Sequence, residues 1–149
     1  MSMENPVNGN GLLYFWQKLK AYFAKKSDLD SLSGRVDDIV ATGDHVDANI
    51  NQRLIENIFF KNSPLHDGAM VISKQRIKAA GCILPVSHDL NIPRELGLRH
   101  RAAMGISQAS DAIAIVVSEE TGRISAAIKG QFRLRLSAEN LEAILTEEL

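Results

Sequence analysis

Apolar residues that recur every three or four positions predict four helices in this chain, and Asp47 and Ser137 are the expected N-caps of the second and the last. The four helices are expected at residues 11–26, 48–60, about 93–107 and from 138 to the C-terminus. Residues 1–10 are predicted to be a flexible tail, and residues 27–41 a polar linker with one short element around 36–40. The remaining chain, 42–149, is expected to form the folded domain.

Shorter apolar runs predict strands between these helices. Two runs flank Lys74-Gln75, which is expected to be a hairpin turn, and two more flank the turn Glu120-Thr121-Gly122. The last strand alternates polar and apolar residues, as an exposed edge strand does. The expected strands are Ala69–Ser73, Arg76–Leu84, Ala112–Val117, Ile124–Ile128 and Gln131–Leu136. Because strands and helices interleave, the pattern favours an α/β or α+β fold with one mixed sheet flanked by helices.

Composition narrows the class of protein. A chain of 149 residues with 45% hydrophobic residues fits one soluble domain, and a net charge of −1 gives no general attraction to nucleic acid. A single cysteine, Cys82, permits no disulfide framework within the chain and fits a reducing, cytoplasmic location. No apolar run reaches the roughly 18 residues of a membrane span, and no signal peptide is visible.

Residues 11–26 combine five aromatic residues with four lysines in an amphipathic pattern. Such a helix can lie in the interface of a membrane. It can equally be docked on the folded domain or on a partner protein, and the sequence leaves both readings open.

The first candidate for chemistry is the run His66-Asp67-Gly68-Ala69, which follows Ser63-Pro64-Leu65 and opens an expected strand. An imidazole, a carboxylate and a bare backbone at the mouth of a strand suit a site for a metal ion and phosphate. A plain structural turn is the competing interpretation.

Two further clusters fall at the ends of expected elements. Gly97-Leu98-Arg99-His100-Arg101 offers two guanidiniums near a helix start, which suits phosphate oxygens. Ser118-Glu119-Glu120 follows a buried strand and offers oxygen ligands for a divalent cation. A solvated helix face and an exposed turn are the alternatives. Together the three clusters fit phosphoryl or nucleotidyl transfer, although no Walker loop or GxGxxG motif is present.

The order and spacing of these motifs resemble those of the diadenylate cyclase (DAC) domain family, particularly its membrane-linked housekeeping type. The resemblance rests on Pro64–Ala69, Gly97–Arg101 and Ser118–Gly122, and it runs from about Thr42 to the C-terminus. It implies condensation of two ATP molecules into cyclic di-AMP with release of two pyrophosphates. It also implies a divalent metal (Mn²⁺, Mg²⁺ or Co²⁺) and a face-to-face homodimer in which each protomer presents one ATP.

The resemblance also implies residue roles. Asp67 would activate the ribose 3′-hydroxyl, Gly68 and Ala69 would line the nucleotide, and His66 and Glu120 would bind the metal. ATP and its phosphates would be contacted by Leu65, Leu98, Arg99, His100, Arg101, Ser118, Glu119 and Thr121. The run 79–85 is similar to the strand beside the adenine, with Ile83 where many relatives place an aromatic residue.

The chain departs from the family pattern upstream. Relatives carry an additional helix and an apolar first strand before the segment that matches 38–44, and residues 27–37 contain no such apolar run. This favours a sheet without the family's first strand and leaves a catalytically inactive, nucleotide-binding or regulatory subunit as the alternative function. Residues 11–26 resemble the juxtamembrane segment of relatives, which places the domain at the inner face of the cell membrane. An HD-type phosphohydrolase using His45, His66-Asp67 and Asp111 is a weaker alternative.

Overall fold

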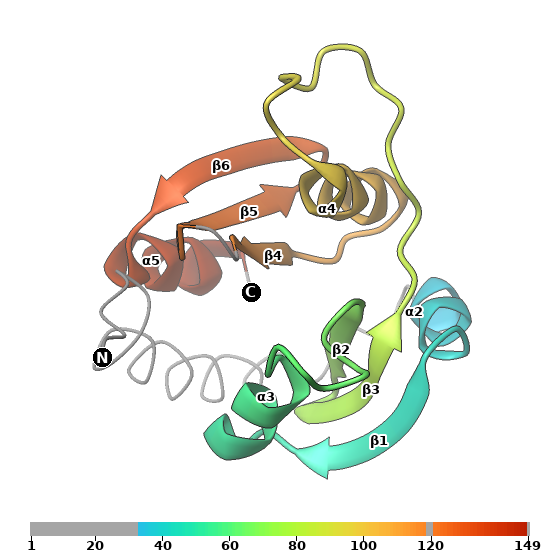
Figure 1. Cartoon of the computed structure of the whole chain (residues 1–149). Helices are drawn as coiled ribbons and strands as arrows, with labels where there is room; N and C mark the ends of the chain where they lie inside the picture. Colours follow the sequence, from blue (N-terminus) through green and yellow to red (C-terminus); the bar gives the residue numbers. More distant parts are fainter. Residues whose placement is uncertain (1–32, 119–120, 149) are drawn as a thin grey trace. The chain divides into compact units, whose positions relative to one another are not determined.

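The structure is a computed structural model that describes residues 33–118 and 121–148, and its chain divides into two compact units (Figure 1). Of the residues that the structure describes, the N-terminal unit contains 33–83 together with 144–148, and the C-terminal unit contains 84–118 and 121–143. Among the described residues, each unit holds one three-stranded sheet whose neighbouring strands are all antiparallel.

The central strand of the N-terminal unit is β3, which pairs with β1 on one side and β2 on the other. The elements in chain order are α2 (Ser33–Val40), β1 (Asp44–Asn49), α3 (Gln52–Ile58), β2 (Ala69–Ser73) and β3 (Arg76–Cys82). Lys74 and Gln75 join β2 to β3 with φ values of 51° and 65°. Two successive left-handed residues are the signature of a tight hairpin turn, so the predicted hairpin is confirmed.

Apolar side chains from α3 and from the sheet form the core of this unit. The buried members are Ile50, Ile55, Ile58, Ile77 and Ala80. Leu65, from the turn before β2, packs against them. This contact ties the predicted His-Asp turn to the hydrophobic core of the unit.

In the C-terminal unit, β5 lies between β4 and β6 and is buried along its whole length. The elements are α4 (Leu98–Ala109), β4 (Ala114–Val117), β5 (Ile124–Ile128), β6 (Gln131–Leu136) and the first part of α5 (Ala138–Glu148), up to Ala143. Helix α4 packs on this sheet through a cluster of small residues that includes Ala103, Val116 and Ala127. Small side chains let a helix approach the strands closely, and Ser107 Oγ then accepts a hydrogen bond from Gly130 N at 3.2 Å.

The α+β class is confirmed, but the single mixed sheet is not what the described residues form. Both three-stranded sheets are entirely antiparallel. The physical reason is connection length, since β2–β3, β4–β5 and β5–β6 are joined by short turns, whereas parallel neighbours need a longer crossover.

Two helix starts were predicted wrongly. Asp47 does not cap a helix: it lies in β1, and the helix begins later, with Asn51 Oδ1 accepting from Leu54 N at 3.1 Å as its N-cap. The helix expected from about 93 begins at Leu98 after Gly97. In contrast, the Ser137 cap of α5 is confirmed, because Ser137 Oγ accepts from Asn140 N at 3.0 Å.

The N-terminal predictions fall largely outside the described residues. The tail at 1–10 and the amphipathic helix at 11–26 lie there entirely. Residues 27–37 are the stretch expected to lack the family's first strand. The described part of this stretch, from Ser33, is helical and belongs to α2, which continues to Val40. In the described ranges, no helix combines the length and the apolar character that crossing a membrane requires.

Candidate functional site

The turn that leads into β2 is held by hydrogen bonds to Ser63. Ser63 N donates to Phe60 O at 2.8 Å, and Ser63 Oγ accepts from Leu65 N at 3.2 Å. The Ser63 carbonyl accepts from His66 N at 3.2 Å and lies 2.8 Å from His66 Nδ1. Because Pro64 fixes its own φ and biases Ser63 toward extended backbone, the sequence favours this local geometry before any tertiary contact forms.

The hydrogen bonds of His66 define its chemical state. A carbonyl oxygen can only accept, so this contact is a hydrogen bond when Nδ1 carries a hydrogen, and a neutral ring with its hydrogen there has a lone pair on Nε2. That nitrogen lies 3.1 Å from Asp67 Oδ1. A lone pair on His66 Nε2 and the carboxylate oxygen repel each other at this distance, so either a further proton or a cation must lie beside them. A histidine whose Nδ1 donates to a backbone carbonyl is also the usual arrangement of a metal ligand, so the donor pair fits a divalent metal.

The two side chains differ in their access to solvent. The His66 side chain is 22% exposed, whereas that of Asp67 is 78% exposed. Asp67 therefore presents one carboxylate oxygen to the imidazole and keeps most of its surface available to a ligand. An imidazole nitrogen with a carboxylate oxygen suits Mn²⁺ or Co²⁺ at least as well as Mg²⁺, which prefers oxygen ligands throughout.

Two glycines, Gly68 in the turn and Gly43 before β1, let the backbone lie directly against the end of β3. A Cβ on Gly68 would lie 2.5 Å from Gly81 Cα and 2.8 Å from Cys82 N, and a Cβ on Gly43 would lie 2.5 Å from Ala80 O. No side chain fits at either position without moving backbone. The glycine after Asp67 thus seats the whole turn directly on β3.

The second cluster forms the first turn of α4. Gly97 is the N-cap and makes no side-chain hydrogen bond to the helix. Leu98 is 70% exposed and Arg99 is also exposed, so the turn presents its side chains outward. The positive end of the helix dipole and a guanidinium at the same place form a surface that favours an anion such as a phosphate.

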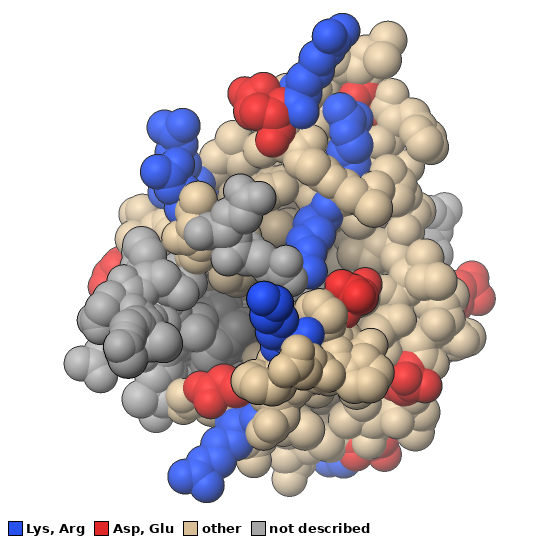
Figure 2. Space-filling model, viewed as in Figure 1, with Lys and Arg blue, Asp and Glu red and all other residues tan. Residues whose placement is uncertain are grey.

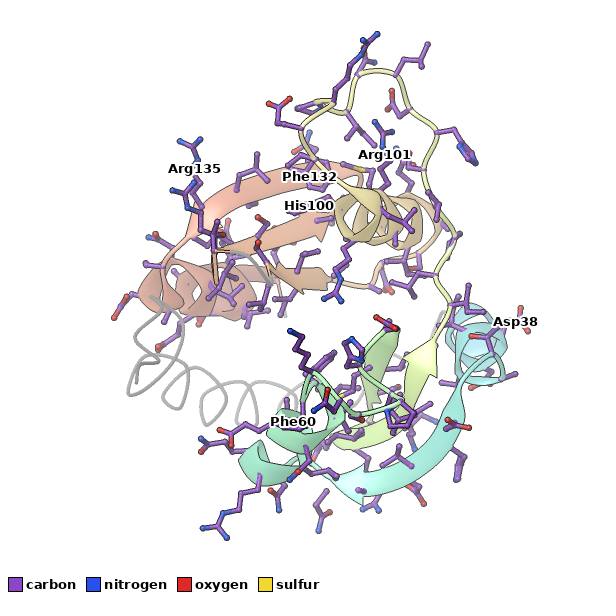
Figure 3. All side chains as sticks on the ribbon, in the orientation of Figure 1. Asp38, Phe60, His100, Arg101, Phe132 and Arg135 are labelled. Atoms are coloured by element: carbon purple, nitrogen blue, oxygen red, sulfur yellow. The ribbon has the colours of Figure 1, made fainter. Side chains whose placement is uncertain are left out.

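The other two residues of this cluster are braced within the C-terminal unit. The His100 ring meets Phe132 of β6 edge to face, with 6.1 Å between centroids (Figure 3). Burial there lowers the pKa of His100 below its ordinary value of 6.5, so the ring is neutral at pH 7. Arg101 O accepts from Ser87 N at 2.9 Å, and Arg101 Nη1 approaches Asp89 O at 3.4 Å. The loop before α4 therefore lies along the helix.

The third cluster is the turn after β4. Ser118 O accepts from Gly122 N at 2.9 Å, and Ser118 Oγ accepts from Thr121 N at 3.3 Å. Thr121 Oγ1 in turn accepts from Arg123 N at 3.2 Å. The predicted turn is confirmed as a local structure, and both hydroxyl groups help to form it. Glu119 and Glu120, the predicted phosphate and metal residues between them, lie outside the described residues.

The predicted site residues thus occur in two units. Leu65 to Ala69 belong to the N-terminal unit, whereas the α4 cluster and the Ser118 turn belong to the C-terminal unit. Within the described ranges no group of three or more His, Cys, Asp or Glu side chains is placed to hold a metal ion. His66 and Asp67 supply two ligand atoms, and further ligands would have to come from Glu120 or from the substrate.

The sequence pointed to the candidate site residues but not to the neighbours that hold them in place. Ser63 fixes the histidine ring, and Ser87 and Asp89 brace Arg101. The Ser-Pro dipeptide ahead of His66 was a usable signal, since serine hydroxyls often close such turns onto a backbone N–H two residues on. The link from Arg101 to Ser87 is a backbone hydrogen bond and has no signal in the side chains.

Comparison with known proteins identifies the family. The DAC family, described as "DisA bacterial checkpoint controller nucleotide-binding", matches residues 13–132, which is more than half of the chain. Cyclic di-AMP synthase CdaA of Bacillus subtilis (strain 168) is 45% identical over 111 residues, covering 74% of this chain and 41% of the relative. A diadenylate cyclase of Listeria monocytogenes is 47% identical over 114 residues, covering 76% of this chain and 42% of the relative.

Solved structures agree with this assignment. The crystal structure of DacA from Staphylococcus aureus, an N166C/T172C double mutant, matches with a TM-score of 0.77 and 36% identity, covering 94% of this chain and 98% of that one. A hypothetical membrane spanning protein from Bacillus cereus matches with a TM-score of 0.67 and 34% identity, covering 85% and 62%. The chain spans less than half the length of the two curated relatives above. On the motifs, the fold and these matches, the chain belongs to the diadenylate cyclase (DAC) domain family.

Proposed function

We propose that this chain condenses two ATP molecules into cyclic di-AMP and two pyrophosphates, in a metal-dependent reaction at a face-to-face homodimer. The observation that carries the proposal is the turn from Ser63 to Gly68, which holds an oriented imidazole beside an exposed carboxylate in a chain of the DAC family. A carboxylate next to a metal ligand is the arrangement that nucleotidyl transfer needs at its attacking hydroxyl.

Asp67 is the proposed base. With 78% of its side chain exposed, it can accept the proton of the ribose 3′-hydroxyl of one ATP. The 3′-oxygen then forms a bond to the α-phosphorus of the ATP on the partner protomer, and the bond from that phosphorus to the bridging oxygen breaks with pyrophosphate leaving. The same exchange in the opposite direction closes the ring. Two nucleotides must face each other, which explains why a dimer is required.

His66 Nε2 is the proposed metal-binding atom in the described residues, with Glu120 as the further ligand that the motif implies and the Asp67 carboxylate beside the ion as the base. When bound, a divalent ion there would neutralise charge on the triphosphate. A neutral His66 ring whose hydrogen is on Nδ1, facing Ser63 O at 2.8 Å, has Nε2 available for this role.

The remaining predicted residues would hold the nucleotide. Arg99 and Arg101 offer guanidinium donors at the positive end of α4, where a triphosphate is electrostatically favoured. His100 is neutral beside Phe132, so it would act as a hydrogen-bonding group rather than as a third cation. Nucleotide contacts are proposed for Leu65, Gly68, Ala69, Leu98, Ser118, Glu119 and Thr121. Part of the proposal is that these groups, from both units, converge on one ATP.

The test is product formation. The full chain at high concentration, incubated with ATP and Mn²⁺, should form cyclic di-AMP and pyrophosphate in a 1:2 ratio, measured by chromatography and mass spectrometry. Asp67→Asn should lower the rate by at least about 100-fold, because general bases typically contribute 10²–10⁴-fold. Asp111→Asn is the matched control, since it makes the same change at another exposed carboxylate and should leave the rate unchanged. Equal rates for the three proteins would refute the role of Asp67.

A catalytically inactive, nucleotide-binding subunit is the second candidate function. It is favoured by the sequence upstream of the folded domain, because residues 27–37 contain no apolar run that could form the family's first strand, and the described part of this stretch, from Ser33, is helical. Titration with a non-hydrolysable ATP analogue separates the two functions. Binding without any product from ATP would support the inactive subunit, whereas binding with turnover would reject it.

Other readings are less well supported. The HD-type phosphohydrolase places its ligands on helices, whereas His45 lies in β1, Asp67 in a turn and Asp111 in a loop after α4. Membrane attachment through residues 11–26, at the inner face of the cell membrane, remains a proposal. Co-sedimentation with anionic liposomes tests it, and binding that survives deletion of residues 1–26 would reject it. Figure 2 shows basic and acidic side chains interspersed on the viewed face, and no nucleic-acid partner is proposed.

A further inference from the structure

Every polar atom of Ser63 is engaged inside the turn. Its N–H donates to Phe60 O at 2.8 Å, and its hydroxyl oxygen accepts from Leu65 N at 3.2 Å. Its carbonyl accepts twice from the same residue, from the backbone N–H and from Nδ1–H of His66. A single oxygen that binds both the backbone and the ring of His66 fixes the ring relative to its own main chain.

The imidazole has two competing partners. The Ser63 carbonyl at 2.8 Å requires a hydrogen on Nδ1, whereas the Asp67 carboxylate at 3.1 Å attracts a hydrogen to Nε2. A neutral ring can satisfy only one of them. With the hydrogen on Nδ1, Nε2 has a lone pair for a metal ion. With the hydrogen on Nε2, that lone pair is lost and the ring is paired with Asp67 instead.

We propose that Ser63 is a positioning residue that selects the Nδ1–H tautomer of His66 and so keeps Nε2 open to the metal. The inference rests on the proposed function only in treating His66 as a metal ligand. The hydroxyl contributes because its bond to Leu65 N closes the turn and aims the Ser63 carbonyl at the ring. Without that bond the carbonyl is less well held, and the Asp67 carboxylate draws the hydrogen to Nε2.

Ser63→Ala removes the hydroxyl and is the main variant. Partners behind a metal-binding histidine typically contribute 10–100-fold to affinity. The backbone carbonyl stays in this variant, so the expected loss of Mn²⁺ affinity is at the lower end, about 10-fold. Electron paramagnetic resonance of free Mn²⁺ measures the affinity on the full chain without any need for turnover. Ser63→Thr keeps the hydroxyl and should bind within about two-fold of the unaltered protein.

The tautomer is read directly by long-range ¹H–¹⁵N correlation of the metal-free protein at alkaline pH. His66→Gln assigns the His66 signals among the four histidines of the chain. The unaltered protein should show Nδ1 protonated and Nε2 unprotonated, and Ser63→Ala should show a rise in protonated Nε2. This spectrum of the unaltered protein tests the proposal even if Ser63→Ala fails to fold.

Ser137→Ala is the matched control because it removes another hydroxyl that accepts from a backbone N–H, far along the chain in the cap of α5. It should change neither measurement. A protonated Nε2 in the unaltered protein, or Mn²⁺ affinity unchanged in Ser63→Ala, would overturn the inference, as would His66→Gln binding Mn²⁺ normally. A chain that shows the expected tautomer and Mn²⁺ binding but forms no cyclic di-AMP would refute the proposed activity and leave this inference standing.

Discussion

The contact between α4 and the loop before it makes a strong prediction at Gly105. This glycine is buried in the middle of the helix, and the backbone of Pro85 crosses directly over it. A Cβ at this position would lie 2.6 Å from the Pro85 carbonyl carbon and 3.1 Å from Ser87 N, with the Pro85 carbonyl oxygen closer still. Alanine therefore cannot fit unless the loop moves away from the helix.

Two opposing effects decide the sign of Gly105→Ala. Helix propensity favours alanine over glycine by up to about 1 kcal/mol. Overpacking against a backbone that cannot rotate away costs about 1–3 kcal/mol. Moving the loop also strains the hydrogen bond from Ser87 N to Arg101 O, which adds about 0.5–1.5 kcal/mol. With the full propensity gain of about 1 kcal/mol subtracted, the sum is a net loss of about 0.5–3.5 kcal/mol in the free energy of unfolding.

Equilibrium unfolding in urea measures this loss. Gly97→Ala in the cap of the same helix is the control, because a Cβ there meets nothing within 4 Å, and it should cost less than about 1 kcal/mol. Gly105→Ala should also weaken ATP binding, since the loop braces Arg101. If Gly105→Ala were as stable as the unaltered protein, or more stable, propensity would outweigh the contact and the described packing of Pro85 on α4 would be refuted.

Three further predictions concern other parts of the chain. Thr42 Oγ1 donates to Ile39 O at 2.6 Å and accepts from Ile83 N at 2.8 Å. Thr42→Val loses both hydrogen bonds and should lower the free energy of unfolding, measured in urea, by about 1–2 kcal/mol. Thr42→Ser keeps the hydroxyl and should not lower it. Burial lowers the pKa of His100, so the unfolded chain binds more protons than the folded one between that pKa and 6.5. The free energy of unfolding should therefore fall as the pH drops through this window. An equally steep fall in His100→Gln would contradict this. Burial raises the pKa of the Cys82 thiol, so a thiol reagent should label it only on unfolding, and rapid labelling of the native protein would refute that burial.

Local signals in the sequence predicted those elements whose determinants are close in sequence. The hairpin at Lys74-Gln75 and the turn from Ser118 to Gly122 close on themselves through neighbouring residues, and both were found where they were expected. The cap at Ser137 is of the same kind. Each depends on residues no more than a few positions apart.

Strand β1 shows why other parts could not be predicted. Its short polar sequence carries no apolar alternation, and it is a strand because it pairs with β3, some 30 residues away. Arg76 reinforces the pairing by donating to Asp47 Oδ1 at 2.6 Å and to Asp47 O at 2.7 Å, across a bulge where Asp47 has a φ of 48°. Asp47 precedes an apolar pattern of helical spacing, so the neighbouring sequence alone predicts that it is a helix N-cap.

The three candidate clusters could be picked out from the sequence, but the hydrogen bonds that hold them in place could not. The three clusters were recognised because their charged residues fall at the ends of elements, and the structure places Asp67, Arg99 and Ser118 at such ends. The tautomer of His66 depends on a backbone carbonyl, and the bracing of Arg101 depends on another backbone contact. Backbone groups are the same at every residue, so these features become visible only in three dimensions. The catalytic roles themselves stay predictions.

The central claim is that groups from both units surround one metal-bound ATP, and paramagnetic broadening tests it most directly. Mn²⁺ held at His66 in the presence of a non-hydrolysable ATP analogue should broaden the amide signal of Gly68 and also those of the first turn of α4, from Leu98 to Arg101. The amide signals of α2, on residues with no proposed contact to the nucleotide, serve as the reference. If the Gly68 signal disappears while the α4 signals stay as sharp as the reference, the clusters do not converge on one nucleotide, and the proposed site is wrong.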